Sequence, residues 1–388
     1  MNYDVAIIGG GASGLACAVH LLRSSKKLNI ALIDAGERFG KKLASTGNGQ
    51  GNVTNRNMSL EYYFSGNLPL VNKIALSSDR VNLEDNLFHC ILQADQSGRV
   101  YPSGKQASAL VDSLLHEVRN SAVYAYLNTK VIHIDKSLNI TCFSGEKISA
   151  KFAVICTGGK AQKQFKTDGS SYALAQSLGH KLTPLFPSLV QLKTDTQNIK
   201  NLKGIRTDCE VSALCNGQVI AKVHGDVIFT DYGVSGNAIF AVSPYVADKP
   251  NCTLSLNFLQ FDDEVIINDI EEKKKAGYFN SELLSGTLHN QLGRAIIKRC
   301  NSNDAKIICK TAKNFTLEVV GTLGFDYAQV TRGGIDMSGI TDELESKLVK
   351  NLFFAGEILD VDGCCGGYNL HWAFASGYAV ADSIIKRV

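Results

Sequence analysis

The chain has 388 residues, of which 45% are hydrophobic, and this composition is that of a globular protein with two or three domains. Its 40 basic and 37 acidic residues leave a formal net charge of +3, which gives no reason to expect a nucleic acid or an anionic membrane as partner. No apolar run is long enough to span a bilayer, and the eleven cysteines are scattered without zinc-ligand spacing, so we expect reduced thiols, no metal site and a cytoplasmic protein. The first predicted strand begins directly after Met1, so we also expect no secretory leader.

The first predicted elements are a strand, a glycine-rich turn and a helix. Val5–Ile8 is an apolar run typical of a parallel strand buried on both faces. The turn that follows has the spacing Gly-x-Gly-x-x-Gly, which permits a sharp bend, close approach of a pyrophosphate and close packing of helix on strand. A helix from about residue 11 to residue 23 would point its N-terminal amides at phosphates. We therefore expect a dinucleotide to bind at Gly9, Gly11, Ala12, Ser13 and Gly14. The alternative is a glycine cluster at a helix start with no ligand.

A second strand, residues 29–33, ends at an acidic residue. Asp34 lies 20 residues after Gly14, where the ribose of a dinucleotide needs a hydrogen-bond acceptor. We expect Asp34 and the adjacent Ala35 to bind that ribose, and a carboxylate here disfavours a 2′-phosphate.

The polar, glycine-rich loop at residues 45–52 follows the second strand. Because it is rich in hydrogen-bond donors, we expect it to contact the cofactor, with Lys42 and Asn48 among the contacts. The alternative is a flexible linker.

A helix and a group of short strands complete the first part of this domain. The helix is predicted at 106–119, and the strands at 122–126, 130–135, 139–143 and 147–150 form a meander that leads into a further strand at 152–156. That last strand ends in Thr157-Gly158-Gly159, whose small residues allow the adenosine part of a cofactor to pass close by. We expect Val131, Thr157 and Gly158 to bind the cofactor.

The alternation of strands and helices stops at about residue 189. Strand-like segments occupy about 189–260, and a charged helical stretch follows at about 261–313. We interpret residues 189–324 as an inserted substrate domain between two parts of one cofactor domain, residues 1–188 and 325–388.

The C-terminal segment provides a second cofactor signature. A strand at 352–355 runs into Gly356-Glu357, then a glycine-rich loop, then a helix from Tyr368 to about residue 386. The carboxylate could accept from a ribityl chain, and the helix N-terminus would stabilise the negative charge of a reduced flavin. With the N-terminal motif, this predicts non-covalent FAD. The expected contacts here are Gly356, Glu357, Gly367, Tyr368, Asn369 and Leu370. The alternative is a buried terminal helix with a glycine entry loop.

Several of these motifs together resemble the BaiN-type family of bacterial NAD(P)/FAD-dependent oxidoreductases over essentially the whole chain. The matching segments are 40–43, 98–102, 157–160, 178–180, 229–236 and 355–372. The resemblance implies an α/β fold, with a Rossmann-type, glutathione-reductase-like FAD domain and an inserted β-plus-helical domain. It also implies reduction of carbon–carbon double bonds conjugated to a ketone. The chain departs from the family pattern at 48–55, where an Arg-Cys pair is replaced by Gln50-Gly51, and at Asn237, which replaces a proline.

The candidates for the chemistry are few. Tyr101 and Tyr232 lie in family-like segments, and either could donate a proton or stack on the flavin; packing is the alternative for both. Cys364 and Cys365 are adjacent, and a disulfide between them would close a strained ring, so we expect a packing role. His371 is more simply a structural histidine than a catalytic acid.

No second Gly-x-Gly-x-x-Gly follows a strand between residues 160 and 330, so a separate nicotinamide domain is not expected. NAD(P)H would then be a transient co-substrate that uses the substrate cleft and leaves before the acceptor enters. We predict an FAD-dependent reductase that passes hydride from NAD(P)H to an electron-poor, enone-like small molecule. The alternatives are a flavin oxidase or dehydrogenase, and a non-catalytic flavin-binding regulator; the sequence leaves the oligomeric state open.

Overall fold

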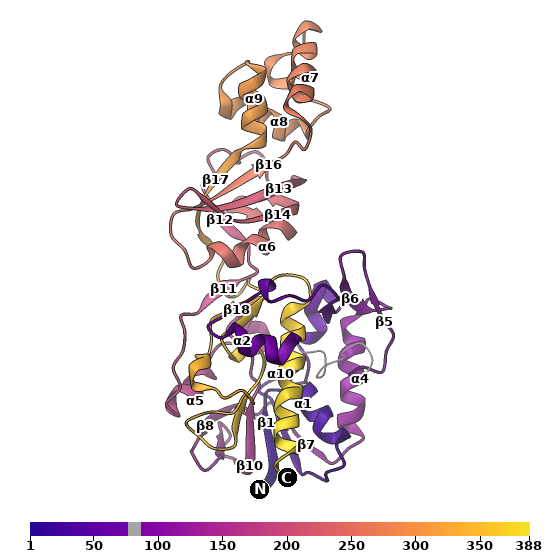
Figure 1. Cartoon of the computed structure of the whole chain (residues 1–388), viewed down its shortest axis with the longest axis vertical. Helices are drawn as coiled ribbons and strands as arrows, with labels where there is room; N and C mark the ends of the chain where they lie inside the picture. The colour runs from indigo at the N-terminus through magenta and orange to yellow at the C-terminus, as the bar shows by residue number, and fades with distance from the viewer. Residues whose placement is uncertain (77–86) are drawn as a thin grey trace. The chain divides into compact units, whose positions relative to one another are not determined.

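The computed structural model describes residues 1–76 and 87–388, and the chain forms two compact units (Figure 1). The first unit contains Met1–Phe186 and Val330–Val388, and the second contains Pro187–Gln329. Each unit has its own apolar core. The second unit is thus an insertion between two parts of the first.

The first unit is built on a sheet of parallel and antiparallel strands in the order β7-β2-β1-β10-β9-β8, with β19 also paired to β10. Its members are β1 (Asn2–Ile8), β2 (Ile30–Ile33), β7 (Val123–Tyr126), β8 (Val131–Ile134), β9 (Asn139–Cys142), β10 (Lys147–Ile155) and β19 (Leu352–Phe354). The strands β7, β2, β1, β10 and β19 are parallel, so their carboxyl ends lie at one edge of the sheet. This is the Rossmann-type α/β fold that the sequence predicts.

β10 differs from the prediction, because the two strands expected at 147–150 and 152–156 form one continuous strand. Its first residues pair antiparallel with β9, and residues 153–155 pair parallel with β19, while the opposite edge pairs with β1. Exposure alternates along the first part, and all of residues 152–155 are buried. The sequence therefore changes from an alternating to a fully apolar pattern within a single strand, which explains why the pattern predicts two strands.

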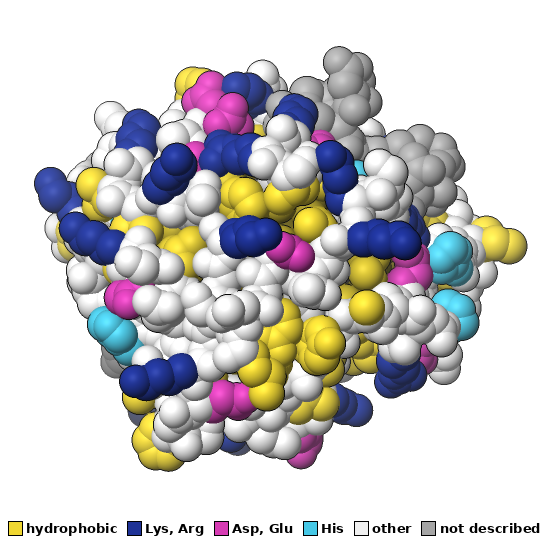
Figure 2. Space-filling view, turned by 90° about the horizontal axis from the view of Figure 1, so that it is seen from below, with side chains coloured by type: hydrophobic (Ala, Val, Ile, Leu, Met, Phe, Trp, Pro, Cys, Tyr) yellow, Lys and Arg dark blue, Asp and Glu magenta, His cyan; other side chains and the backbone are white. Residues whose placement is uncertain are grey.

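Helices pack on this sheet, and α10 (Tyr368–Ile385) lies against α1 (Ala12–Arg23) (Figure 1). The other helices are α2 (Leu68–Val71), α4 (Ala107–Arg119) and α5 (Tyr172–Ser177). The short strands of this unit are β3 (Thr54–Asn55), β4 (Tyr63–Ser65), β5 (Leu92–Ala94), β6 (Arg99–Pro102), β18 (Val330–Arg332) and β20 (Val361–Gly363), and β11 (Phe186–Ser188) lies where the chain leaves the unit. Figure 2 shows the face that carries both chain ends, where Lys and Arg side chains are more frequent than Asp and Glu.

The second unit is a closed β-barrel with helices inserted in the chain between its strands. The barrel order is β12-β15-β14-β13-β16-β17, with bounds β12 (Leu192–Thr194), β13 (Arg206–Cys215), β14 (Gln218–Phe229), β15 (Gly233–Ser235), β16 (Cys252–Asn257) and β17 (Phe315–Thr322). The helices are α6 (Asn237–Val246), α7 (Asp263–Lys275), α8 (Asn290–Cys300) and α9 (Ala305–Lys313). The inserted domain with β and helical parts is thus present, and Leu189 and Gln329 close its base through a 3.1 Å backbone hydrogen bond.

Among residues 1–76 and 87–388, none of the helices has both the length and the apolar character needed to cross a membrane.

Candidate functional site

The turn after β1 passes so close to the end of β10 that only glycine fits. Gly9 has φ +107°, and a Cβ at this position would collide with the carbonyl oxygen of Cys156. Its amide donates to the Ile33 oxygen at 2.7 Å, which holds the turn between β2 and β10. At Gly11, by contrast, a Cβ would meet no atom within 4 Å. The turn therefore has open space in front of Gly11, where a pyrophosphate can approach the backbone.

The N-terminus of α1 opens directly from this turn. No side chain caps the helix, and its first turn contains no acidic residue. The amides of its first residues, including Ala12 and Ser13, and the positive end of the helix dipole are thus available to an anion.

The Asp34 carboxylate hydrogen-bonds to two backbone segments, the turn after β1 and the loop after β2. Its two carboxylate oxygens accept from the amides of Gly10, at 2.7 Å, and Gly36, at 2.6 Å. Burial raises the pKa of Asp34, and the two amides act in the opposite direction. Because an ionised carboxylate offers about four acceptor positions, Asp34 can still accept from a ribose.

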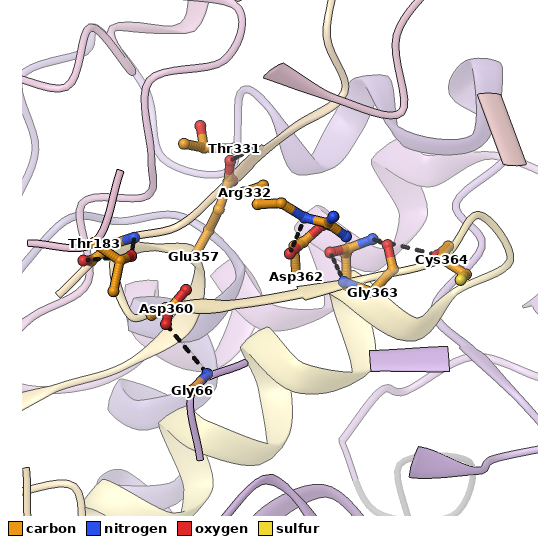
Figure 3. Close-up of polar contacts among 11 residues, drawn as sticks. Gly66, Thr183, Thr331, Arg332, Glu357, Asp360, Asp362, Gly363 and Cys364 are labelled. Atoms are coloured by element: carbon orange, nitrogen blue, oxygen red, sulfur yellow. Dashed lines mark hydrogen bonds and ion pairs between the residues drawn. The ribbon is translucent and has the colours of Figure 1, made fainter. Parts of the chain in front are cut away.

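Glu357 connects three segments that are distant in the sequence. One oxygen accepts from the Lys42 ammonium at 2.9 Å. The other accepts from the Thr331 amide at 2.9 Å (Figure 3). The Thr331 hydroxyl accepts from the amide of Lys160 at 2.7 Å. Glu357 thereby orders the end of β19, β18 and the loop after β10 around one carboxylate.

The two glycine motifs of the chain meet between α1 and the end of β19. The Ser13 hydroxyl lies 3.4 Å from the Ala355 oxygen, and a Cβ at Gly356 would contact this hydroxyl. Trp372 and Ser376 of α10 hydrogen-bond to the carbonyl and amide of Gly356 at 3.1 and 2.9 Å. The structure therefore brings together residues predicted at the two ends of the chain.

The start of α10 is also uncapped, with no acidic residue in its first turn. Gly367 has φ +101°, and a Cβ there would collide with the Thr54 oxygen. The Asn369 side chain accepts from the Gly363 amide at 2.8 Å and donates to the Gly363 oxygen at 2.7 Å. The Tyr368 ring stacks on Tyr62, with ring centroids 4.7 Å apart. These two side chains order the loop, so it is the backbone amides at this helix start that remain for a ligand.

The residues present fit FAD. The Thr157 hydroxyl at the end of β10 is buried and has no hydrogen-bond partner among the described residues. A buried hydroxyl in this state destabilises a protein by about 1–3 kcal/mol, so it indicates a group that bound cofactor would satisfy. This hydroxyl, the space at Gly11 and the two uncapped helix starts lie at the carboxyl edge of one sheet, where α/β folds bind their ligands.

The other residues predicted to bind the cofactor differ in position and in exposure. Ala35 and Gly158 follow β2 and β10 directly and are partly exposed, and Leu370 lies in the first turn of α10. Asn48 is exposed in the 3-10 segment at Leu43–Gly49, with φ 55°. Val131, in contrast, begins β8, and its side chain packs into the apolar core. The roles of these residues stay predictions.

Tyr101 lies on β6 in a half-buried position close to Arg99 and Cys365. Burial raises the pKa of the Tyr101 hydroxyl, and Arg99 lowers it by a smaller amount. Burial likewise raises the pKa of the Cys365 thiol, and neither Cys364 nor Cys365 forms a disulfide with another described residue. The other tyrosine candidate, Tyr232, belongs to the second unit, where its backbone oxygen accepts from Thr194 at 3.1 Å.

His371 has both ring nitrogens engaged inside the protein. Nε2 donates to the Ala75 oxygen at 2.7 Å, and Nδ1 lies 2.7 Å from the Thr54 hydroxyl. Burial lowers the pKa of this histidine, so the ring is neutral at pH 7 and orders α10 against β3.

Sequence reasoning missed a buried ion pair next to this site. Arg332 Nε lies 3.2 Å from Asp362, which is 1% exposed, and the guanidinium lies 3.8 Å above the ring of Phe64 (Figure 3). These residues are separated by at least 30 positions and follow no motif spacing. The fold alone brings them together, because β20 pairs with β4 and β18 lies against β20.

A sequence profile of the family described as "HI0933-like protein Rossmann domain" matches residues 3–383. A Clostridium scindens protein named 3-dehydro-bile acid delta(4,6)-reductase is 31% identical, over 99% of both chains. An Escherichia coli ribosomal RNA dihydrouridine synthase is 27% identical, over 99% of this chain and 98% of that protein.

Among solved structures, a 3-ketosteroid-Δ4-(5α)-dehydrogenase from Rhodococcus jostii RHA1 superposes with a TM-score of 0.50 at 15% identity, covering 99% of this chain and 97% of that one. At that identity the likeness concerns the fold alone.

Proposed function

This chain belongs to the HI0933-like family and is an FAD-dependent oxidoreductase, and we propose that it passes hydride from NAD(P)H to a carbon–carbon double bond conjugated to a carbonyl group. The observation that carries the proposal is the single site in which the Gly9–Gly14 turn, Asp34 and Glu357 meet. The coverage of both relatives, over at least 98% of each chain, supports the same architecture.

The names of the two relatives describe one kind of acceptor. A 3-oxo steroid with a double bond at position 4 and a uridine base both contain a carbon–carbon double bond conjugated to a carbonyl. In each, hydride adds to the carbon farther from the carbonyl, the electron pair moves toward the carbonyl oxygen, and a proton then adds to the neighbouring carbon. The proposed acceptor is therefore a compound with an electron-poor carbon–carbon double bond conjugated to a carbonyl group.

Different residues of the site would bind different parts of the cofactor. Asp34 would accept from the adenosine ribose, and the α1 amides beyond Gly11 would bind the pyrophosphate. The start of α10 would place its positive dipole end near the flavin. When bound, FAD supplies hydride transfer between a nicotinamide and the acceptor.

Tyr101 is the proton donor in this proposal. Because burial raises its pKa, the hydroxyl keeps its proton at pH 7. After the proton is donated, the positive charge of the adjacent Arg99 would stabilise the tyrosinate. The same attraction is why Arg99 lowers the pKa of Tyr101. Tyr232 remains the other predicted donor and is tested by the same substitution to phenylalanine.

The test begins with the purified protein, which should be yellow and should release FAD on acid precipitation. NADH and NADPH oxidation is then followed without oxygen, with and without a 3-oxo-Δ4 steroid or 2-cyclohexenone. Acceptor-dependent oxidation with a saturated product supports the proposal. Bound FMN, or flavin that is reduced only by a donor substrate and reoxidised by oxygen, would replace it with another cofactor or with an oxidase.

Uridine in RNA is a second candidate acceptor of the same chemical class. The observation that favours it is a basic cavity in the first unit, described next.

A further inference from the structure

The first unit contains a basic cavity that is separate from the flavin site. Its volume is about 800 Å³, and it opens on the face that carries the chain ends (Figure 2). Cationic side chains from five separate segments line it: Lys26, Lys27, Lys136, Lys151, Lys350 and Arg387. Because these residues are spread over more than 360 positions, the fold and not a sequence run creates the cluster.

Half of these cations have partners within the protein. Lys151 pairs with Asp4 at 2.8 Å, Arg387 pairs with Glu345 at 2.8 Å, and the Lys26 ammonium donates to the Val388 oxygen at 2.6 Å. Asp4 is the acidic side chain of the lining, and Lys151 neutralises it.

The other three cations, Lys27, Lys136 and Lys350, are exposed. No hydrogen bond or ion pair joins their ammonium groups to any residue in the described ranges 1–76 and 87–388. Like charges gathered without counter-charges repel one another, so this arrangement does not stabilise the fold. It provides, however, three positive groups around one concave surface for an external anion.

The cavity suits a chain of phosphates better than a single one. Isolated phosphates are typically held by backbone amides or by a bidentate Arg, whereas the free groups here are lysines, which act as separate point charges. The lining also includes the apolar residues Leu28, Leu138 and Phe152, of which the last two are buried, so the lysines are the groups available to a ligand. Spaced lysines contact a nucleic-acid backbone without reading its sequence.

The cavity and the flavin site lie at opposite edges of one sheet. Asp4 is near the start of β1, Lys27 precedes β2 and Lys350 precedes β19, whereas Gly9, Asp34 and Glu357 follow the carboxyl ends of these strands. A ligand that contacts both edges must be a macromolecule.

We propose that this basic cavity binds the phosphate backbone of a structured RNA, as an anchor remote from the reacting base. The proposal rests on the second acceptor candidate, uridine in RNA, and goes beyond it by assigning the contact surface.

The test measures binding of the FAD-loaded protein to a fluorescein-labelled RNA stem-loop by anisotropy, at several KCl concentrations. The variant is Lys27→Gln/Lys136→Gln/Lys350→Gln. The control is Lys298→Gln/Lys306→Gln/Lys310→Gln, which removes three exposed lysines of α8 and α9 with the same charge change. We expect the Kd of the cavity variant to rise about tenfold or more near 0.1 M salt, and the slope of log Kd against log salt to fall by about 2, because about 0.7 to 0.9 of a counterion is released per phosphate contact. The control should bind like the parent.

Equal losses in the two variants, or no loss in either, would overturn the proposal. A second outcome would also overturn it. In that outcome the parent binds vesicles containing phosphatidylglycerol as tightly as RNA, and the cavity variant loses vesicle binding but keeps RNA binding. Reduction of 2-cyclohexenone should be unchanged in the cavity variant. Because binding is measured without turnover, a failed enone assay and a failed RNA assay are separate results.

Discussion

Substitution of Asp34 tests the cofactor site most directly, because its carboxylate has two roles that can be measured separately. In the protein without FAD it accepts from the amides of Gly10 and Gly36, at 2.7 and 2.6 Å. In the holoenzyme it would also accept from the adenosine ribose. Asp34→Ala removes both roles, whereas Asp34→Asn keeps the size and one acceptor oxygen.

The expected magnitudes follow from counting the groups that lose a partner. Two half-buried amides lose an acceptor in Asp34→Ala, and at about 1–2 kcal/mol each the free energy of unfolding without FAD should fall by about 2–4 kcal/mol. The ribose contact should weaken FAD binding by a further 1–3 kcal/mol, or roughly 5- to 150-fold in Kd. Asp34→Asn should lie between Ala and the parent in both measurements.

Urea unfolding of the deflavinated protein measures the first quantity, and flavin fluorescence quenching on titration measures the second. Glu37→Ala is the matched control, because this neighbouring carboxylate is 67% exposed and forms only an i,i+4 ion pair with Lys41. If folded Asp34→Ala binds FAD within twofold of the parent, another group holds the ribose and the assignment is refuted. In that case, a Kd for FAD that rises roughly 5-fold or more in Glu37→Ala would identify Glu37 as that group.

Three further substitutions test the remaining assignments. Cys364→Ser with Cys365→Ser should keep flavin reduction by NAD(P)H within about tenfold, or about 1.4 kcal/mol of barrier, and lost turnover together with a lost charge-transfer band would contradict the packing role. Tyr101→Phe should slow anaerobic reoxidation of the flavin by the enone about 10²- to 10⁴-fold while flavin reduction is unchanged, and equal losses in both half-reactions would indicate a structural role. Burial lowers the pKa of His371, so below about pH 6.5 the unfolded state binds more protons, and the free energy of unfolding should fall as the pH drops from 7 to 5. This fall should be smaller in His371→Gln; because the pKa of His180 is lowered too, some pH dependence should remain, and an identical fall in parent and variant would disprove the assignment.

The sequence predicts those parts of the site that depend on local backbone geometry. Gly9 and Asp34 are recognisable because a tight turn and a ribose acceptor need fixed residue types at fixed spacing. Glu357 is recognisable because a strand end precedes it and glycines follow. The last residues of α1 and β2 likewise agree with their predicted bounds, and their first residues differ from them by one.

Features that depend on long-range pairing were not predictable in the same way. Arg332 and Asp362 meet only because the fold places β18 against β20, and neither residue belongs to a motif. Lys27, Lys136 and Lys350 gather in one cavity although the net charge of the chain is only +3. The expectation that nucleic acid is not a partner relied on that overall balance, which does not report how charges are distributed on a folded surface.

The position of β19 has a consequence for synthesis of the protein. Residues 352–354 fill one edge of β10, and Glu357 and α10 follow them, so the first unit is incomplete until the whole second unit has been translated. During that interval the edge of β10 and the face of α1 that α10 covers are open to water and to other chains. The nascent protein therefore carries an unpaired strand edge for as long as the ribosome needs to make the roughly 200 residues between the end of β10 and β19, about 10–40 s at 5–20 residues per second, and folding factors would act on this intermediate.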